Sequence, residues 1–343
     1  MERATGTVRS VGVDIVGAPA LVYADLDAPG YGRRRHGRGF MFLTPDGKRL
    51  SEPDALAHCR SLVIPPAWND IWIGQRTDGH ILCTGLDGRD RKQYIYHPLW
   101  NEWRNRRKFE SLPEFASRLH RIRDAVDRDL TGARLSKRRV VAAAVRLVDR
   151  GLVRVGNDAY ARDNRTFGAT TLRARHVDTG PGDCVTLDFV GKSNQERHVV
   201  LEDAALARSL RYCQELPGQR LFRYRDADGD VHPVDSADVN AYLREASGIE
   251  AISAKDFRTW GGTVAAWAHA DAHRDDALAR PDVAAIRHAA KTLGNTMTVA
   301  RKYYVHPALL TAIANGKTPP RARRSRKRMD IGETSVARFL DSL

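Results

Sequence analysis

The sequence LGNTMTVARKYYVHP at residues 293–307 contains two adjacent tyrosines, Tyr303 and Tyr304, shortly before a proline. Pro307 suits the first turn of a helix, where its missing N–H is not needed, so we predict a short helix from Pro307 to Asn315. A tyrosine beside a helix start is usually a packing residue. These tyrosines therefore indicate chemistry only if other segments support it.

Two further segments place an arginine among apolar neighbours. Arg154 lies in Leu-Val-Arg-Val-Gly-Asn at residues 152–157, and Arg258 lies in Ala-Lys-Asp-Phe-Arg at residues 254–258. Burial of an arginine is costly unless the charge has a partner. Each arginine therefore indicates either a structural ion pair or an anion-binding site, and its neighbours alone leave both alternatives open.

The hydrophobic pattern changes near residue 104. Residues 1–100 contain short apolar runs bounded by Asp-Gly turns, as in strands, and the rest of the chain has mainly helical spacing. We predict an α+β protein with a strand-rich N-terminal domain over 1–103, a mainly helical domain over 104–316 and a basic tail over 317–343. Helices are expected over 136–150, 236–247 (with a serine N-cap), 253–270 and 281–293, and a β-hairpin over 184–201 with its turn at 191–194.

The charge of the chain points to an anionic partner. The 343 residues contain 56 Lys and Arg against 42 Asp and Glu, which gives a net charge of +14. Such an excess indicates nucleic acid first and an acidic membrane second. Residues 317–328 carry seven basic residues, two prolines and little to bury, so we expect a flexible arm there.

Several classes of protein are disfavoured by the same sequence. No apolar run approaches the ~18 residues of a membrane span, and the N-terminus lacks the apolar stretch of a secretory signal. The cysteines are far apart, which argues against a disulfide framework and a cysteine-rich zinc site. We therefore expect a soluble intracellular protein. The four cysteines are Cys59, Cys83, Cys184 and Cys213.

Common cofactor and metal motifs are incomplete. Gly-Lys-Ser at 191–193 and Gly-Lys-Thr at 316–318 both lack the glycine that a phosphate loop needs five residues earlier. Residues 226–230 resemble the start of a calcium loop but lack its later glycine and acid, so a hairpin turn is favoured. His269 and His273 form a pair with no visible third ligand. We expect neither a metal nor a cofactor.

Taken together, the segments resemble the DNA topoisomerase IB family in its compact bacterial and poxvirus-like form. The resemblance extends from about residue 33 to 313, and its catalytic blocks occur in the family's order. They are separated by 38 residues from Arg154 to Lys192 and by 46 residues from Arg258 to Tyr304. The matching stretches are Ile64–Trp68, Gly88–His97, Arg154–Tyr160, Thr166–Leu172, Phe189–Lys192, Lys255–Arg258 and Tyr304–Pro307.

The resemblance implies that Tyr304 attacks a DNA phosphodiester and forms a 3′-phosphotyrosyl link. The family spacing Tyr-x-x-Pro selects Tyr304 and not Tyr303. Arg154 and Arg258 match the arginines that stabilise the transition state, and Lys192 matches the acid that protonates the leaving 5′-oxygen. Where many relatives have histidine this chain has Asn295, which donates a hydrogen bond but carries no charge.

The resemblance also implies which residues contact DNA. Gln93, Tyr94 and Tyr96 match a strand that lies in the major groove, although sheet packing is an alternative for one of the tyrosines. Tyr160 matches another DNA-facing position. The protein is expected to act as a monomer that clamps duplex DNA in the cytoplasm, associated with the nucleoid, without a protein partner. Removal of residues 317–343 is expected to weaken DNA binding and its salt dependence.

Two other functions remain open from the sequence. A tyrosine site-specific recombinase uses the same nucleophile and arginines, but usually has histidine where this chain has Lys255, and its DNA-binding domain is commonly helical. A basic DNA-binding protein without catalysis is the second alternative, and the complete set of expected catalytic residues argues against it.

Overall fold

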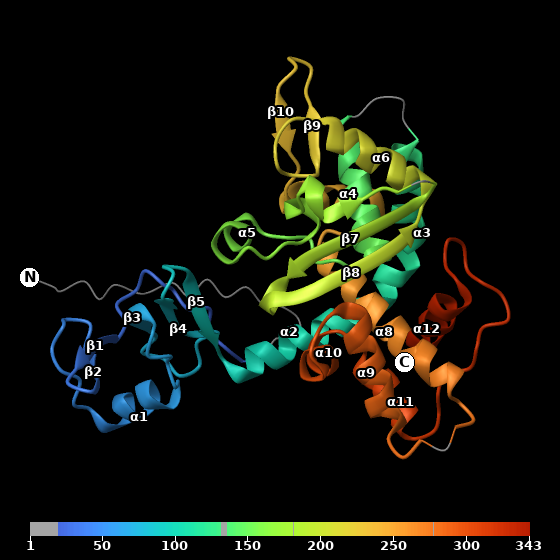
Figure 1. The fold of residues 1–343 in the computed structure, drawn as a ribbon. Coiled ribbons are helices and arrows are strands. Elements are labelled where there is room, and N and C mark those ends of the chain that lie inside the picture. Colours follow the sequence, from blue (N-terminus) through green and yellow to red (C-terminus); the bar gives the residue numbers. More distant parts are fainter. Residues whose placement is uncertain (1–19, 132–135, 181, 277) are drawn as a thin grey trace, which may run out of the picture. The chain divides into compact units, whose positions relative to one another are not determined.

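A computed structural model describes residues 20–131, 136–180, 182–276 and 278–343 (Figure 1). The chain forms two compact units that divide between Lys108 and Phe109. This division lies within helix α2 (Pro98–Glu110), which also contains the expected boundary at residue 103. The small strand-rich unit and the larger mainly helical unit together confirm the α+β class predicted from the sequence.

The described part of the N-terminal unit is built from short antiparallel strands, helix α1 and most of helix α2. Strands β1 and β2 form a hairpin, and β3, β4 and β5 form a three-stranded sheet in that order. Its core is small and contains Leu50, Cys59, Ile73 and Cys83. The elements are β1 (Gly32–His36), β2 (Gly39–Leu43), α1 (Pro53–Ser61), β3 (Asn69–Ile73), β4 (Ile81–Leu86) and β5 (Lys92–Tyr96).

The C-terminal unit packs its helices around one continuous hydrophobic core. The long helices are α3 (Leu112–Leu130), α4 (Lys137–Gly151), α6 (Ala204–Glu215), α7 (Ser236–Ser247), α8 (Ala254–Ala272) and α9 (Pro281–Leu293). The shorter helical elements are α5 (Asp158–Asn164), η1 (Ala169–Thr171), η2 (Ala174–His176), η3 (Lys192–Asn194), α10 (Met297–Tyr303), α11 (Pro307–Ala314) and α12 (Ile331–Asp341). The strands are β6 (Val177–Asp178), β7 (Cys184–Gly191), β8 (Gln195–Glu202), β9 (Arg223–Arg225) and β10 (Val231–Pro233).

Residues that the sequence predicts as helix ends, such as Ser136 and Gly294, begin or end helices in the structure. The Ser136 side chain accepts a hydrogen bond from the Arg139 N–H and caps α4, and Gly294 ends α9 in the left-handed conformation that glycine adopts easily. The predicted hairpin is confirmed as β7 and β8, paired in continuous register. One detail is wrong: α7 is capped by the side chain of Asp235 and not by a serine.

The basic C-terminal segment is not the flexible arm that its composition indicated. Trp267 Nε1 donates to the Pro319 carbonyl at 3.0 Å, and the Ala322 N–H donates to Ser335 Oγ at 2.8 Å. Ala322 and Met329 are buried. The expectation failed because counting basic residues overlooks these apolar anchors, and because Lys327 and Arg328 pair with acidic side chains of α3.

A buried ion-pair network fixes this segment to the core. Arg123 on α3 donates to both oxygens of Asp149 on α4 and to both oxygens of Glu333 on α12, each at 2.8 Å. Trp260 Nε1 on α8 also donates to Glu333, at 3.1 Å. Burial raises the pKa of Glu333, but the hydrogen bonds and charge of Arg123 outweigh it, so the pKa is lowered overall. The carboxylates of Asp149 and Glu333 therefore join four helices, α3, α4, α8 and α12.

Within the described residues, no helix combines the length and the apolar character that crossing a membrane requires.

We predict that Glu333→Ala destabilises the protein by roughly 3–5 kcal/mol, because it leaves the buried Arg123 without one of its two carboxylates. The matched control is Asp341→Ala, which breaks the exposed pair between Arg326 and Asp341. That change should cost about 0–1 kcal/mol. Urea unfolding measures both, and equal small losses would show that the network does not hold α12.

Candidate active site

Tyr304 lies at the junction of two short helices. Its N–H donates to the Ala300 carbonyl at 2.9 Å and ends α10, and His306 caps α11 by accepting from the Ala308 N–H. Thr263 on α8 holds the backbone between them, donating to the Tyr304 carbonyl and accepting from the His306 N–H. The expected helix at Pro307 is confirmed as α11, and its start fixes the position of Tyr304.

Helix α8 approaches this junction very closely. A Cβ atom at Gly262 would lie 2.7 Å from the Tyr304 carbonyl oxygen and 3.3 Å from the Tyr304 Cβ. The glycine is needed here for close approach of two backbones. It brings the start of α8, which carries Arg258, against the tyrosine.

Arg258 is buried beside the Tyr304 ring. Only 2% of the arginine is exposed, and its Cζ lies 5.1 Å from the centroid of the tyrosine ring. Its guanidinium donates to the carbonyls of Leu152 and, at 2.9 Å, of Leu293. These carbonyls belong to the segments that lead to Arg154 and to Asn295. Arg258 therefore ties three parts of the expected site together.

Arg154 and Asn295 contact one another, although they are far apart in sequence. Arg154 Nη2 donates to Asn295 Oδ1 at 2.5 Å. The Arg154 carbonyl accepts from the Ala169 N–H at 2.7 Å, and a Cβ at Gly168 would lie 2.6 Å from the backbone nitrogen of Gly156. The loop carrying Arg154 is thus held tightly against the Thr166–Leu172 segment.

The site contains donors and charges that the protein itself does not satisfy. Among the described residues, the buried side-chain polar atoms without a hydrogen-bond partner are Arg223 Nε, Arg258 Nε and Asn295 Nδ2. Two of the three therefore belong to this site. Among the residues that the structure describes, no carboxylate forms an ion pair with Arg154 or Arg258. These arginines therefore do not form the structural ion pair that the sequence left open. Unpaired buried donors and cations favour an anion with several oxygen atoms.

Lys192 stands at the tip of the β7–β8 hairpin. Ser193 and Asn194 follow it in the left-handed conformation, with φ values of 63° and 58°, and the lysine side chain is exposed. The Phe167 N–H donates to the Val190 carbonyl and joins the hairpin to the Thr166–Leu172 segment. The charge of Lys192 acts on Tyr304, so the hairpin brings it within electrostatic range of the tyrosine.

The environment favours ionisation of the Tyr304 hydroxyl. Burial raises its pKa, but the charges of Arg258, Arg154 and Lys192 and a hydrogen bond from Arg258 outweigh burial, and the pKa falls below its usual value. Burial, helped by the charge of Arg154, lowers the pKa of Arg258 to about 10. Burial lowers the pKa of His306 to about 4, so this helix cap is neutral near pH 7.

Arg197 is a cation near this site that the sequence analysis missed. It lies on β8, and its guanidinium donates to the Thr292 carbonyl at 3.3 Å, two residues before Gly294. Burial and the charge of Arg154 both lower its pKa. The signal that could have revealed it is the alternation of β8, which places Arg197 on the inner face with Val199 and Leu201.

The expected DNA-contact residues divide between two faces of β5. Tyr94 and Tyr96 lie on one face with ring centroids 5.8 Å apart, and Arg104 lies over the Tyr96 ring at 5.7 Å. Gln93 belongs to the opposite face and donates to Asp87 at 2.9 Å. The structure therefore brings the tyrosines together without Gln93. The side chain of Tyr160, which belongs to α5, lies outside the described residues.

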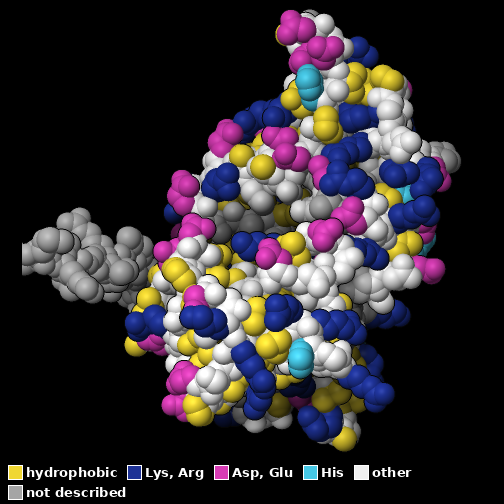
Figure 2. All heavy atoms as spheres, turned by 90° about the vertical axis from the view of Figure 1, so that its left-hand side faces the viewer, with side chains coloured by type: hydrophobic (Ala, Val, Ile, Leu, Met, Phe, Trp, Pro, Cys, Tyr) yellow, Lys and Arg dark blue, Asp and Glu magenta, His cyan; other side chains and the backbone are white. Residues whose placement is uncertain are grey.

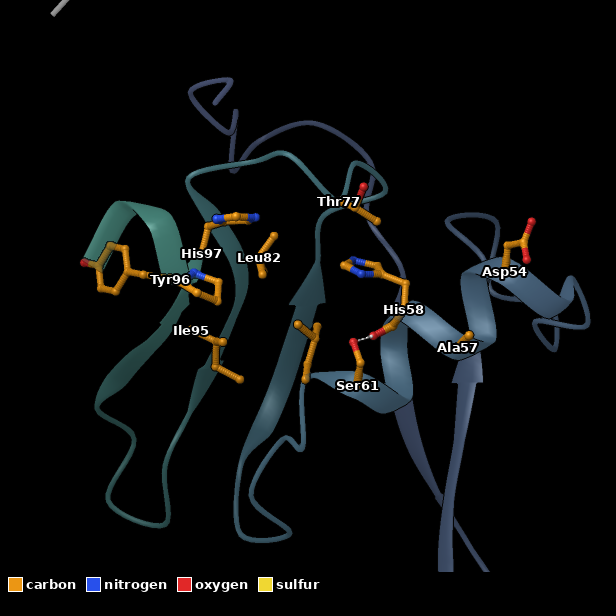
Figure 3. Close-up of a pocket in the computed structure, with 11 residues that line it drawn as sticks. Asp54, Ala57, His58, Ser61, Thr77, Leu82, Ile95, Tyr96 and His97 are labelled. Carbon is orange, nitrogen blue, oxygen red and sulfur yellow. Dashed lines mark hydrogen bonds between the residues drawn. The ribbon is translucent and has the colours of Figure 1, made fainter. Parts of the chain in front are cut away.

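The N-terminal unit contains a hollow of about 590 Å³ (Figure 3). His58, Tyr96 and His97 line it together with apolar side chains of α1, β4 and β5. His58 Nε2 is within hydrogen-bond distance of the Gly74 carbonyl, and His97 Nδ1 accepts from the Leu99 N–H. Both histidines thus serve local structure.

The possible metal ligands noted in the sequence form ordinary local contacts. Asp226, Asp230 and His232 bring ligand atoms within 4.8 Å of one another at an exposed turn. Asp226 is engaged by the backbone of Asp228 and Asp230 and by His232, as the predicted hairpin turn requires. His269 and His273 lie with ring centroids 4.2 Å apart at a helix end.

Basic side chains are spread widely over the surface. The face shown in Figure 2 carries many Lys and Arg side chains with acidic ones between them. In the C-terminal segment, Arg321, Arg323 and Arg324 are exposed and have no ion-pair partner among the described residues. These three arginines are available to a polyanion, unlike Lys327 and Arg328.

Two family models match the chain. The model for the catalytic core of eukaryotic DNA topoisomerase I matches residues 98–321, and the model for the N-terminal domain of bacterial DNA topoisomerase IB matches residues 39–87. The first match includes Arg154, Lys192, Arg258, Asn295 and Tyr304.

Individual relatives agree with the family models. The DNA topoisomerase 1B of Acanthamoeba polyphaga mimivirus is 30% identical over 236 residues, which are 68% of this chain and 70% of that protein. The DNA topoisomerase 1B of Vaccinia virus (strain Copenhagen) is 23% identical over 164 residues, 47% of this chain and 51% of that protein. Among solved structures, the XerH site-specific recombinase bound to palindromic difH substrate matches with a TM-score of 0.35 and 16% identity, over 57% of this chain and 50% of that one.

We predict that Arg154→Gln raises the pKa of Tyr304, because it removes a cation that stabilises the tyrosinate. Titration by the ultraviolet absorbance of tyrosinate, with the Tyr304→Phe protein subtracted, isolates this hydroxyl. The transition should move to higher pH in Arg154→Gln and stay in place in Arg150→Gln, which changes an exposed arginine near the end of α4. An unmoved transition in both variants would show that Arg154 does not act on the tyrosine.

Proposed function

The chain belongs to the type IB DNA topoisomerases, and we propose that Tyr304 is the nucleophile through which it cuts and rejoins one DNA strand. The observation that carries this proposal is the Tyr304 ring beside the buried Arg258 guanidinium, 5.1 Å from its centroid, with neither Arg154 nor Arg258 neutralised by a carboxylate among the described residues. These charges lower the pKa of Tyr304. The unpaired Arg258 Nε and Asn295 Nδ2 support the same role, since each is a buried donor that a phosphoryl oxygen would satisfy.

The proposed reaction conserves atoms and charge. The Tyr304 oxygen attacks phosphorus and forms a phosphotyrosyl ester at the 3′ end, while the bond from phosphorus to the 5′-oxygen breaks. The tyrosine proton passes to solvent, and Lys192 supplies a proton to the leaving oxygen. The free strand rotates, and its 5′-hydroxyl then attacks the phosphotyrosine in the reverse reaction. The ester retains the bond energy, so the cycle needs no ATP.

The remaining residues divide into transition-state and DNA contacts. Arg154, Arg258 and Asn295 stabilise the negative charge that develops on the phosphoryl oxygens. Tyr94 and Tyr96 are the DNA contacts that we propose on β5, because they share a face of the strand with Lys92, and Lys92 and Tyr94 are exposed. Gln93 contacts DNA only if it leaves Asp87.

We further propose that the protein works as a monomer without a protein partner, in the cytoplasm and associated with the nucleoid. Support comes from the chemistry, since all five expected catalytic residues belong to one unit of one chain. The net charge of +14 favours residence on DNA. The four cysteines are free, as in a reducing compartment.

We expect Tyr304→Phe to abolish covalent DNA adducts on a nicked or suicide duplex oligonucleotide, because it removes the attacking oxygen. Tyr303→Phe is the matched control: its side chain is 38% exposed, and the change should leave adduct formation intact. Denaturing gels of the trapped complexes measure both variants. The reverse pattern would overturn the assignment of the nucleophile.

The wild-type protein should relax supercoiled plasmid in the presence of EDTA and without ATP. A recombinase would instead join or exchange two specific sites. Recombinant products without relaxation would favour that alternative.

The triple change of Arg321, Arg323 and Arg324 to alanine should weaken DNA binding and its dependence on salt. The slope of log K against log salt falls by about 0.9 for each phosphate contact that is lost. The corresponding triple change to lysine keeps the charge and should keep most of the slope. Deletion of residues 317–343 is a poorer probe, because it also removes Glu333 and α12. An unchanged slope in the alanine variant would exclude this surface from DNA binding.

A further inference from the structure

Arg197 occupies a position where the fold would ordinarily place an apolar side chain. Along β8 the partly buried residues alternate with exposed ones, and Val199 and Leu201 of the inner face pack against the main core. Arg197 is the next residue on this face and pairs across the hairpin with the buried Phe189. An arginine turned inward needs a partner or a function.

Its contacts place the guanidinium on the turn between α9 and α10. Nη2 donates to the Thr292 carbonyl at 3.3 Å. A Cβ at Gly294 would overlap the guanidinium and would lie 2.7 Å from Arg197 Cδ. Gly294 is therefore required both by its φ of 58° and by the arginine that covers it. The next residue, Asn295, carries the unpaired Nδ2.

The charges around Arg197 distinguish it from an arginine that only caps the end of a helix. A cation at the C-terminus of a helix is favourable, and the Thr292 contact has this character. That contact uses one of the five N–H donors of the guanidinium. The charge of Arg154 helps to lower the pKa of Arg197, and the charge of Arg197 helps to lower the pKa of Arg258. Among the described residues, no carboxylate pairs with any of these three arginines.

We propose that Arg197 is a further phosphate-binding residue of this site, which donates to a non-bridging oxygen of the scissile phosphodiester beside Asn295. The neutral amide of Asn295 supplies a hydrogen bond, and Arg197 supplies positive charge at the same edge of the phosphate. This inference rests on the proposed function, because it concerns the phosphate that Tyr304 attacks. It adds a residue from β8 to a site otherwise built from the Arg154 loop, the hairpin tip, α8 and the α9–α10–α11 segment.

The test is single-turnover cleavage of a suicide duplex by Arg197→Ala, Arg197→Lys and a control. Loss of a charge-stabilising donor is expected to slow cleavage about 100-fold. Arg197→Lys should recover part of the rate because it keeps the charge. The control is Arg211→Ala, since Arg211 is also partly buried and also donates to backbone carbonyls, those of Gly180 and Gly182. It should cleave at the wild-type rate.

A second substrate distinguishes phosphate binding from a purely structural role. A methylphosphonate at the scissile position removes one negative charge, so Arg197→Ala and wild type should cleave it at similar rates. DNA affinity, measured in the Tyr304→Phe background, should change much less than the rate. An equal loss on charged and neutral substrates, without recovery in Arg197→Lys, would mean that Arg197 only holds the turn and would overturn the proposal.

Failure of the two proposals would look different. If wild type forms no adduct, the function proposed for Tyr304 fails. If wild type forms the adduct and Arg197→Ala forms it equally fast on the phosphodiester, only the role of Arg197 fails.

Discussion

The active site depends on like charges held together by neutral groups. Arg258 is fixed by the carbonyls of Leu152 and Leu293, and Arg197 by the carbonyl of Thr292. A carbonyl orients a guanidinium without cancelling its charge, whereas a carboxylate would do both. The repulsion between these cations remains in the free protein and is relieved when an anion binds. The proposed function requires such a site, because the scissile phosphate would supply the negative charge that the protein does not.

A second buried arginine of the same chain, Arg123, is neutralised by carboxylates. Arg123 is neutralised by Asp149 and Glu333, and its hydrogen bonds connect α3, α4 and α12. That arginine contributes stability, because each of its N–H donors has a partner. Arg258 is buried to a similar degree but has carbonyl partners and an open Nε. The two buried arginines therefore differ in the type of partner and not in burial, as the role proposed for Arg258 requires.

Local signals in the sequence were sufficient for much of the fold. The cap at Ser136, the glycine at 294 and the alternation of β7 depend on neighbouring residues, so they could be recognised without the tertiary structure. The resemblance of the motif blocks then related Arg154, Lys192, Arg258 and Tyr304 to one reaction. Arg197 could not be predicted in this way, because its contact with the turn between α9 and α10 is known only from the tertiary structure.

The errors have a similar origin. The basic segment after residue 317 was judged from its charge, but its placement is decided by Ala322 and Met329 and by acids on α3 more than a hundred residues away. The separation of Gln93 from Tyr94 and Tyr96 likewise follows from the pleat of β5, which turns alternate side chains to opposite faces. Long-range pairing and side-chain direction are properties that composition does not report.

The most direct test of this account is a crystal structure of the Tyr304→Phe protein bound to a duplex that contains its cleavage site. The account predicts that oxygens of the scissile phosphate accept hydrogen bonds from Arg258 Nε and Asn295 Nδ2, the two donors that are unpaired in the free protein. If both donors remain unpaired while DNA is bound, or if the phosphate lies away from residue 304, the central claim is contradicted.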